Sequence, residues 1–192
     1  MACCHTCLTL RRFVHRIAHG ESESRDSGYP SCPAQGLGPV EAGRSCAGFE
    51  LPDAYLNLIC FKDLCGHSKL VLYFYPSDDA PCCTAEALEF SVLEMDFREC
   101  GALVFGVSRD DCMVHGAFRD KHGLAVQLLS DVEGEVCRRY GVLEMKEYEG
   151  RRRECIRRST FVIDRKGVVR HALYGVSPRG HAAEVLQLIK EI

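Results

Sequence analysis

The chain has 192 residues, of which 46% are hydrophobic and 27% charged, and its formal net charge is −3. This is the composition of an ordinary globular protein, long enough for one domain with a proper core. The weak net charge gives no argument for a nucleic-acid or membrane partner, and no run approaches the ~18 apolar residues of a membrane span.

The first 42 residues are expected to form an extension that is disordered or weakly ordered, followed by one domain at 43–192. Residues 20–43 are rich in Gly, Ser, Pro, Glu and Asp and show no apolar periodicity. Residues 11–17 are basic and amphipathic, which is compatible with an organelle address, a mis-assigned start codon or a non-functional extension. We favour the non-functional extension.

Thirteen cysteines occur along the chain. A secreted, disulfide-rich protein would be shorter and would begin with an export signal, but residues 1–17 contain no continuous apolar stretch. A reducing compartment, the cytoplasm, is therefore expected. Cys4 and Cys7 form a C-x-x-C pair that would hold zinc only with His15 or His19, and no second such pair follows.

Apolar periodicity beyond the extension predicts strands that alternate with helices. A short β element, a turn and a short helix are expected at 49–65, and the main buried strand at 70–75. Further strands are expected at 102–108, 126–129, 159–163 and 168–173, and helices at 84–99, 110–122, 132–140 and 181–192. This order predicts the α/β class, with a central mixed sheet flanked by helices on both faces.

The stretch 69–89 combines a buried strand, a loop with two prolines and the start of a helix. Cys82 and Cys83 fall where the helix begins. The first turn of a helix carries unpaired N–H groups and the positive end of the dipole, which favours the nucleophilic thiolate. The alternative is that both cysteines are small buried apolar residues.

Residues 75–84, YPSDDAPCCT, resemble the active-site loop of the peroxiredoxins, closest to the bacterioferritin comigratory protein or PrxQ branch of the AhpC/TSA proteins. Other segments resemble the same branch in the same order, namely GRSCAGFELP, FGVSRD, LLSD, YGV and RSTFVID. The resemblance implies a thioredoxin-like fold, which agrees with the predicted order of elements.

The resemblance also implies roles for individual residues. Cys83 would be the peroxidatic nucleophile, Arg158 would stabilise the thiolate and the peroxide, and Pro76 would shield the sulfur. Cys82 takes a glycine position of the branch and is interpreted as a spectator. Glu86 lies about one helical turn after Cys83, where it either orients Arg158 by a salt bridge or is a solvated acid favoured by the helix dipole.

Two departures from the branch concern catalysis. Ala80 stands where the family has a threonine whose hydroxyl faces the thiolate and the peroxide. Leu88 and Arg119 occupy the two familiar places of the resolving cysteine. Cys112 lies two helical turns before Arg119 on the same face and is a possible resolving cysteine; otherwise an external thiol resolves the sulfenic acid.

We therefore expect a thiol-dependent peroxidase that reduces hydrogen peroxide and organic hydroperoxides to water and alcohols and is recycled by thioredoxin or another thiol. No metal, haem or flavin is expected, and a monomer or weak dimer is favoured. A redox-sensing or partner-binding protein with little turnover is the alternative, supported by Ala80 and the missing resolving cysteines. A zinc module on the N-terminal cysteines is a third possibility.

Overall fold

The computed structural model describes residues 39–148 and 150–192, which are built around a five-stranded mixed sheet. Its strands run in the order β5-β4-β3-β8-β9. β4 is parallel to β3 and β5, whereas β8 is antiparallel to β3 and β9. The strand bounds are Lys69–Phe74 (β3), Ala102–Ser108 (β4), Gln127–Ser130 (β5), Ser159–Ile163 (β8) and Val169–Tyr174 (β9).

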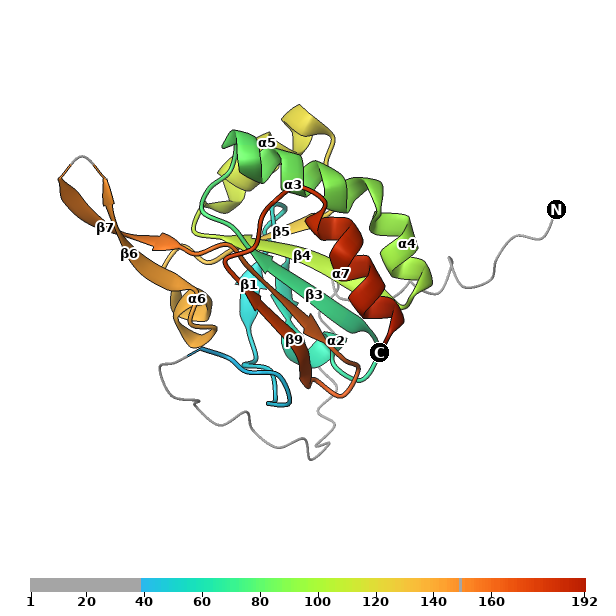
Figure 1. Ribbon diagram of the computed structural model, residues 1–192. Coiled ribbons are helices and arrows are strands. Elements are labelled where there is room, and N and C mark those ends of the chain that lie inside the picture. Colours follow the sequence, from blue (N-terminus) through green and yellow to red (C-terminus); the bar gives the residue numbers. More distant parts are fainter. Residues whose placement is uncertain (1–38, 149) are drawn as a thin grey trace. The chain divides into compact units, whose positions relative to one another are not determined.

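Helices cover both faces of this sheet, which confirms the predicted fold class. Figure 1 shows α3, α4 and α7 gathered on one face, and α2 and α6 contribute to the core on the other. The helix bounds are Phe61–Leu64 (α2), Pro81–Val92 (α3), Glu94–Glu99 (α4), Cys112–His122 (α5), Glu135–Arg139 (α6) and His181–Lys190 (α7).

The central strand β3 is buried on both sides because its alternate side chains enter two separate cores. Leu70, Leu72 and Phe74 point into one core, and Val71 and Tyr73 into the other. The near-continuous apolar run that identified this strand in the sequence is therefore explained by burial on both faces.

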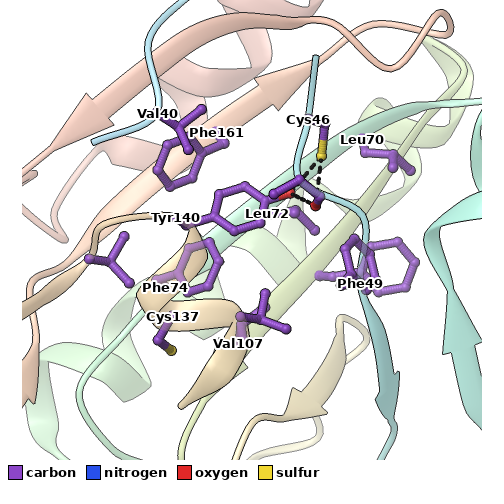
Figure 2. Close-up of a cluster of buried hydrophobic side chains, with 14 of the residues drawn as sticks. Val40, Cys46, Phe49, Leu70, Leu72, Phe74, Val107, Cys137, Tyr140 and Phe161 are labelled. Carbon is purple, nitrogen blue, oxygen red and sulfur yellow. Dashed lines mark hydrogen bonds between the residues drawn. The ribbon is translucent and has the colours of Figure 1, made fainter. Parts of the chain in front are cut away.

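Figure 2 shows the first core, in which aromatic rings from several elements meet. Phe161 packs edge-on against Phe74 and Tyr140, with ring centroids 5.6 and 4.9 Å apart. The Tyr140 hydroxyl donates to the carbonyl of Ala47 at 2.9 Å and lies 2.6 Å from the sulfur of Cys46. The segment that precedes the first strand is thereby fixed to the main core.

Residues 1–38 lie outside the described part of the chain, and with them the predicted zinc cysteines and most of the predicted extension. Val40 is buried in the first core, and its N–H donates to the Tyr174 hydroxyl at 2.7 Å. Two short strands follow in a separate antiparallel pair, β1 (Glu50–Pro52) and β2 (Leu58–Cys60).

The predicted helix at 84–99 is two helices in the structure. The first begins at Pro81, because proline at the first helical position has a suitable fixed φ and needs no N–H partner. The chain turns at Leu93 and continues as α4, which brings Phe97 beside Phe90 with ring centroids 5.9 Å apart. No glycine or proline marks this break, so periodicity alone did not reveal it.

A second feature absent from the prediction is a hairpin of β6 (Leu143–Tyr148) and β7 (Arg151–Ile156). Figure 1 shows it extending away from the central sheet. Its charged side chains are mostly exposed, so the strands lack the apolar alternation by which half-buried strands are recognised. No helix of residues 39–148 and 150–192 is long and apolar enough to cross a membrane.

Candidate active site

Cys83 is the third residue of α3 and lies against the central sheet. The loop after β3 ends at Ala80, which has extended backbone angles and precedes the helix without a side-chain cap. Only 2% of the Cys83 surface is exposed, whereas Cys82 is exposed. The two neighbouring thiols therefore differ sharply in environment, and of the two only Cys83 is buried at the helix N-terminus.

Sheet pairing carries Arg158 from far along the chain to this sulfur. Ser159 pairs with Phe74, so the residue before β8 lies beside the end of β3, where the cysteine loop begins. Nη2 of Arg158 donates to Sγ of Cys83 at 3.2 Å. The Arg158 carbonyl accepts from Gly175 N at 2.7 Å, which fixes the backbone that presents the guanidinium.

Glu86 binds the same guanidinium, since Nη1 of Arg158 donates to its Oε2 in a salt bridge. The side chain of Glu86 is 0% exposed, so the structure excludes a solvated acid at this position. Burial raises the pKa of Glu86 to about 7, although Arg158 opposes this by favouring the carboxylate. Burial alone would lower the pKa of Arg158, but Glu86 and Cys83 raise it above its ordinary value.

The other predicted site residues are Pro76, Ala80 and Cys112. Pro76 is exposed at the entrance of the loop, and Ala80 packs half-buried against the core that contains Cys83. Cys112 is the first residue of α5, with a half-buried free thiol that is not bonded to Cys83. The structure therefore brings together Cys83, Glu86 and Arg158, and shows no bond between Cys83 and Pro76 or Cys112.

The sequence prediction missed a buried polar network that holds the cysteine loop. Tyr75 Oη donates to Asp78 Oδ1 at 2.7 Å, and Asp78 Oδ2 lies 2.8 Å from His115 Nδ1. The other ring nitrogen of His115 lies 3.3 Å from the carbonyl oxygen of Leu129. One signal was available: His115 falls three residues before Phe118, on the inward face of its helix.

These features can support nucleophilic attack by sulfur. Helix N–H groups and a guanidinium both stabilise a thiolate, and the same donors can hold an oxygen on which charge develops. Among residues 39–148 and 150–192, no group of three or more His, Cys, Asp and Glu side chains is placed to hold a metal ion. The fold and the site define a thiol-dependent peroxidase with a thioredoxin-like fold.

Comparison with known proteins gives the family. Residues 42–172 match the AhpC/TSA family. The chain is 38% identical over 147 residues to a putative peroxiredoxin bcp of Coxiella burnetii, covering 77% of this chain and 97% of the relative. It is 35% identical over 153 residues to the peroxiredoxin Bcp of Bacillus subtilis, covering 80% and 97%.

Comparison with solved structures gives the same family. The bacterioferritin comigratory protein of Xanthomonas campestris matches with a TM-score of 0.71 and 36% identity, over 74% of this chain and 90% of that one. The PrxQ of Xylella fastidiosa matches with a TM-score of 0.74 and 32% identity, over 79% and 96%. The chain belongs to the AhpC/TSA family of peroxiredoxins, in the Bcp or PrxQ branch.

Proposed function

We infer that this peroxiredoxin reduces hydrogen peroxide and organic hydroperoxides through Cys83, with Arg158 as the electrostatic partner. The observation that carries the assignment is the hydrogen bond from Arg158 Nη2 to the buried sulfur, 3.2 Å long. The X. campestris relative is described as having alkyl peroxide reduction activity, which supports an organic hydroperoxide as one substrate.

The oxidative half-reaction converts the thiolate into a sulfenic acid. The Cys83 thiolate attacks one peroxide oxygen, an S–O bond forms and the O–O bond breaks. The sulfur loses two electrons, and the departing oxygen takes up a proton to leave as water or an alcohol. Arg158 stabilises the thiolate and the developing negative charge, and Glu86 orients Arg158 from the opposite side.

The reductive half-reaction requires two thiols. The first condenses with the sulfenic acid to give a disulfide and water, and the second displaces Cys83 as a free thiol. Thioredoxin or another thiol is the proposed reductant, and Cys112 is a possible internal resolving cysteine. The proposed enzyme is cytoplasmic and is a monomer or weak dimer. Pro76 is proposed to shield the Cys83 sulfur.

Steady-state peroxide consumption with a thiol reductant tests the assignment. Cys83→Ser is expected to abolish turnover, since a hydroxyl is a far poorer nucleophile than a thiolate. The matched control is Cys82→Ser, which changes the adjacent exposed thiol and is expected to retain activity. Full activity in Cys83→Ser would overturn the assignment.

A redox sensor with little turnover is the second candidate, favoured by Ala80 in place of the loop hydroxyl. A sensor would form the oxidised Cys83 once and would then consume no further peroxide in the presence of excess thiol. The same assay separates the two, because a peroxidase consumes many equivalents of peroxide per protein.

A further inference from the structure

The loop that leads to Cys83 is attached to α5 by a buried pair of side chains. The side chains of Asp78 and His115 are 2% and 0% exposed, and their 2.8 Å contact joins residues 37 positions apart in the chain. The backbone N–H of Asp78 donates to Asp110 Oδ2 at 2.8 Å, at the residue just before the N-cap of the same helix. Side chain and backbone of one loop residue are thus both held by the α5 region.

Each side-chain oxygen of Asp78 and each ring nitrogen of His115 has a polar partner. Both ring nitrogens of His115 face oxygen atoms, the carboxylate of Asp78 and the carbonyl of Leu129. Both contacts are hydrogen bonds if an imidazolium donates to the carboxylate and to the carbonyl. Both are also hydrogen bonds if a neutral imidazole accepts from a protonated Asp78 and donates to the carbonyl. The second oxygen of Asp78 accepts from Tyr75, so the buried polar atoms of the network have partners. A satisfied buried network of this kind is rigid and costly to break.

The two half-reactions of Cys83 require different conformations of this loop, closed for peroxide and open for the reducing thiol. Peroxide is small and reacts with a thiolate that the surrounding protein holds in place. The reducing thiol must reach the sulfur of the sulfenic acid, but Cys83 is only 2% exposed. The segment around Cys83 must therefore open during each cycle, and Asp78 lies five residues before Cys83 on that segment.

We propose that Asp78 and His115 form a latch that keeps the cysteine loop closed for reaction with peroxide and whose release admits the reducing thiol. They are positioning residues: they act through the loop and do not touch the reacting atoms. The latch sets how often the loop opens, and thereby the rate at which the sulfenic acid is reduced. The inference rests on the peroxidase function proposed above.

The test measures the two half-reactions separately on the full chain. Cys83 is oxidised with a short pulse of hydrogen peroxide, and its sulfenic acid is then reduced with glutathione, both followed by mass spectrometry of the Cys83 peptide. In His115→Phe an aromatic ring is kept but both hydrogen bonds are lost. If the closed form still predominates, more frequent opening raises the reduction rate roughly 10-fold, while oxidation changes less than about twofold.

Two variants serve as controls. Asp78→Asn can donate to a neutral His115 and still accept from Tyr75, so it is expected to restore near wild-type rates for both steps. Asp79→Asn removes the negative charge of the next residue, which pairs with Lys121 and His122, and at 50% exposure of Asp79 these ion pairs contribute little. It is expected to leave both rates within about twofold of wild type.

The outcomes separate the latch from a purely structural role. A folded His115→Phe protein whose reduction rate is unchanged, or whose two rates fall together, would overturn the latch. Faster reduction in Asp79→Asn to the same extent would also overturn it, because any loop contact would then suffice. Wild-type protein that forms no sulfenic acid at Cys83 would instead overturn the proposed function.

Discussion

The Cys83 sulfur, the Arg158 guanidinium and the Glu86 carboxyl group interact with one another. The guanidinium of Arg158 lies between the sulfur and the Glu86 carboxyl group, so two potential anions share one cation. Glu86 is fully buried, and its pKa of about 7 means that it loses part of its negative charge near neutral pH. A partly neutral Glu86 orients Arg158 while leaving more of its positive charge for the sulfur.

The first prediction concerns this buried acid. Below about pH 4.5 both the folded and the unfolded chain hold the Glu86 proton, and as pH rises the unfolded chain releases it first. Folding stability due to Glu86 is therefore lost as pH rises toward 7, by about 3 kcal/mol in total. Glu86→Gln removes this titration, so its free energy of unfolding should gain about 3 kcal/mol relative to wild type between pH 4 and pH 8.

Urea unfolding of both proteins across this pH range measures the effect. The difference between the two proteins isolates the one group, because every other titrating group is shared. A difference that stays constant with pH would show that Glu86 titrates normally in the folded protein.

The second prediction concerns Ala80, which precedes the helix that carries Cys83. Ala80→Thr introduces the hydroxyl donor that the resemblance to the peroxiredoxins implies for this position, and it is expected to raise the rate of Cys83 oxidation roughly 10-fold or more, since one preorganised donor to a developing charge can be worth 10²–10³ in rate. Ala80→Val has nearly the same shape without the hydroxyl. Stopped-flow measurement of Cys83 oxidation in the two variants separates the effect of the hydroxyl from the effect of side-chain shape. Equal oxidation rates in the two variants would show that the hydroxyl does not assist the reaction.

At the scale of elements, close packing between strands and helices supports the catalytic helix. Tyr73 stacks on Phe90 of α3, with ring centroids 4.6 Å apart. Its ring reaches across Gly106 of the neighbouring strand, where a Cβ atom would lie 2.6 Å from the Tyr73 hydroxyl oxygen and 2.8 Å from Leu128. Only glycine at this position leaves room for the tyrosine ring under α3.

The third prediction follows from this packing. Gly106→Ala should lower the free energy of unfolding by about 1–3 kcal/mol, the usual cost of overpacking a well-filled core. The matched control is Gly116→Ala in α5, where the nearest atom to the new Cβ is 3.7 Å away and alanine favours the helix by about 1 kcal/mol. Urea midpoints of the two variants should move in opposite directions, and a neutral Gly106→Ala would contradict this view of the packing.

At the scale of the whole molecule, the sequence predicted the order of the elements because buried apolar residues recur with the period of the strand or helix. The apolar run of β3 and the amphipathic helices are examples. The site residues Cys83 and Arg158 were predicted from the resemblance of residues 75–84 and 158–164 to the peroxiredoxins. The pairing of β8 beside β3 then explains why residues 75 positions apart in the chain meet.

The features that the sequence did not reveal depend on tertiary contacts alone. For Glu86 the sequence left two alternatives, a salt bridge to Arg158 and a solvated acid, and only the folded chain decides for the buried salt bridge. Asp78 and His115 are separated by 37 positions and follow no shared motif. The first four residues of β7 in the hairpin β6–β7 are exposed, so the strand shows no apolar alternation.

The central claim is that Arg158 activates the Cys83 sulfur, and the rate constant for Cys83 oxidation by hydrogen peroxide tests it most directly. Arg158→Gln should lower this rate constant by about 10²–10³-fold. Arg157→Gln, which changes the neighbouring guanidinium that lies over the Tyr174 ring, should leave it nearly unchanged. An Arg158→Gln protein that is folded and reacts within threefold of wild type would contradict the claim.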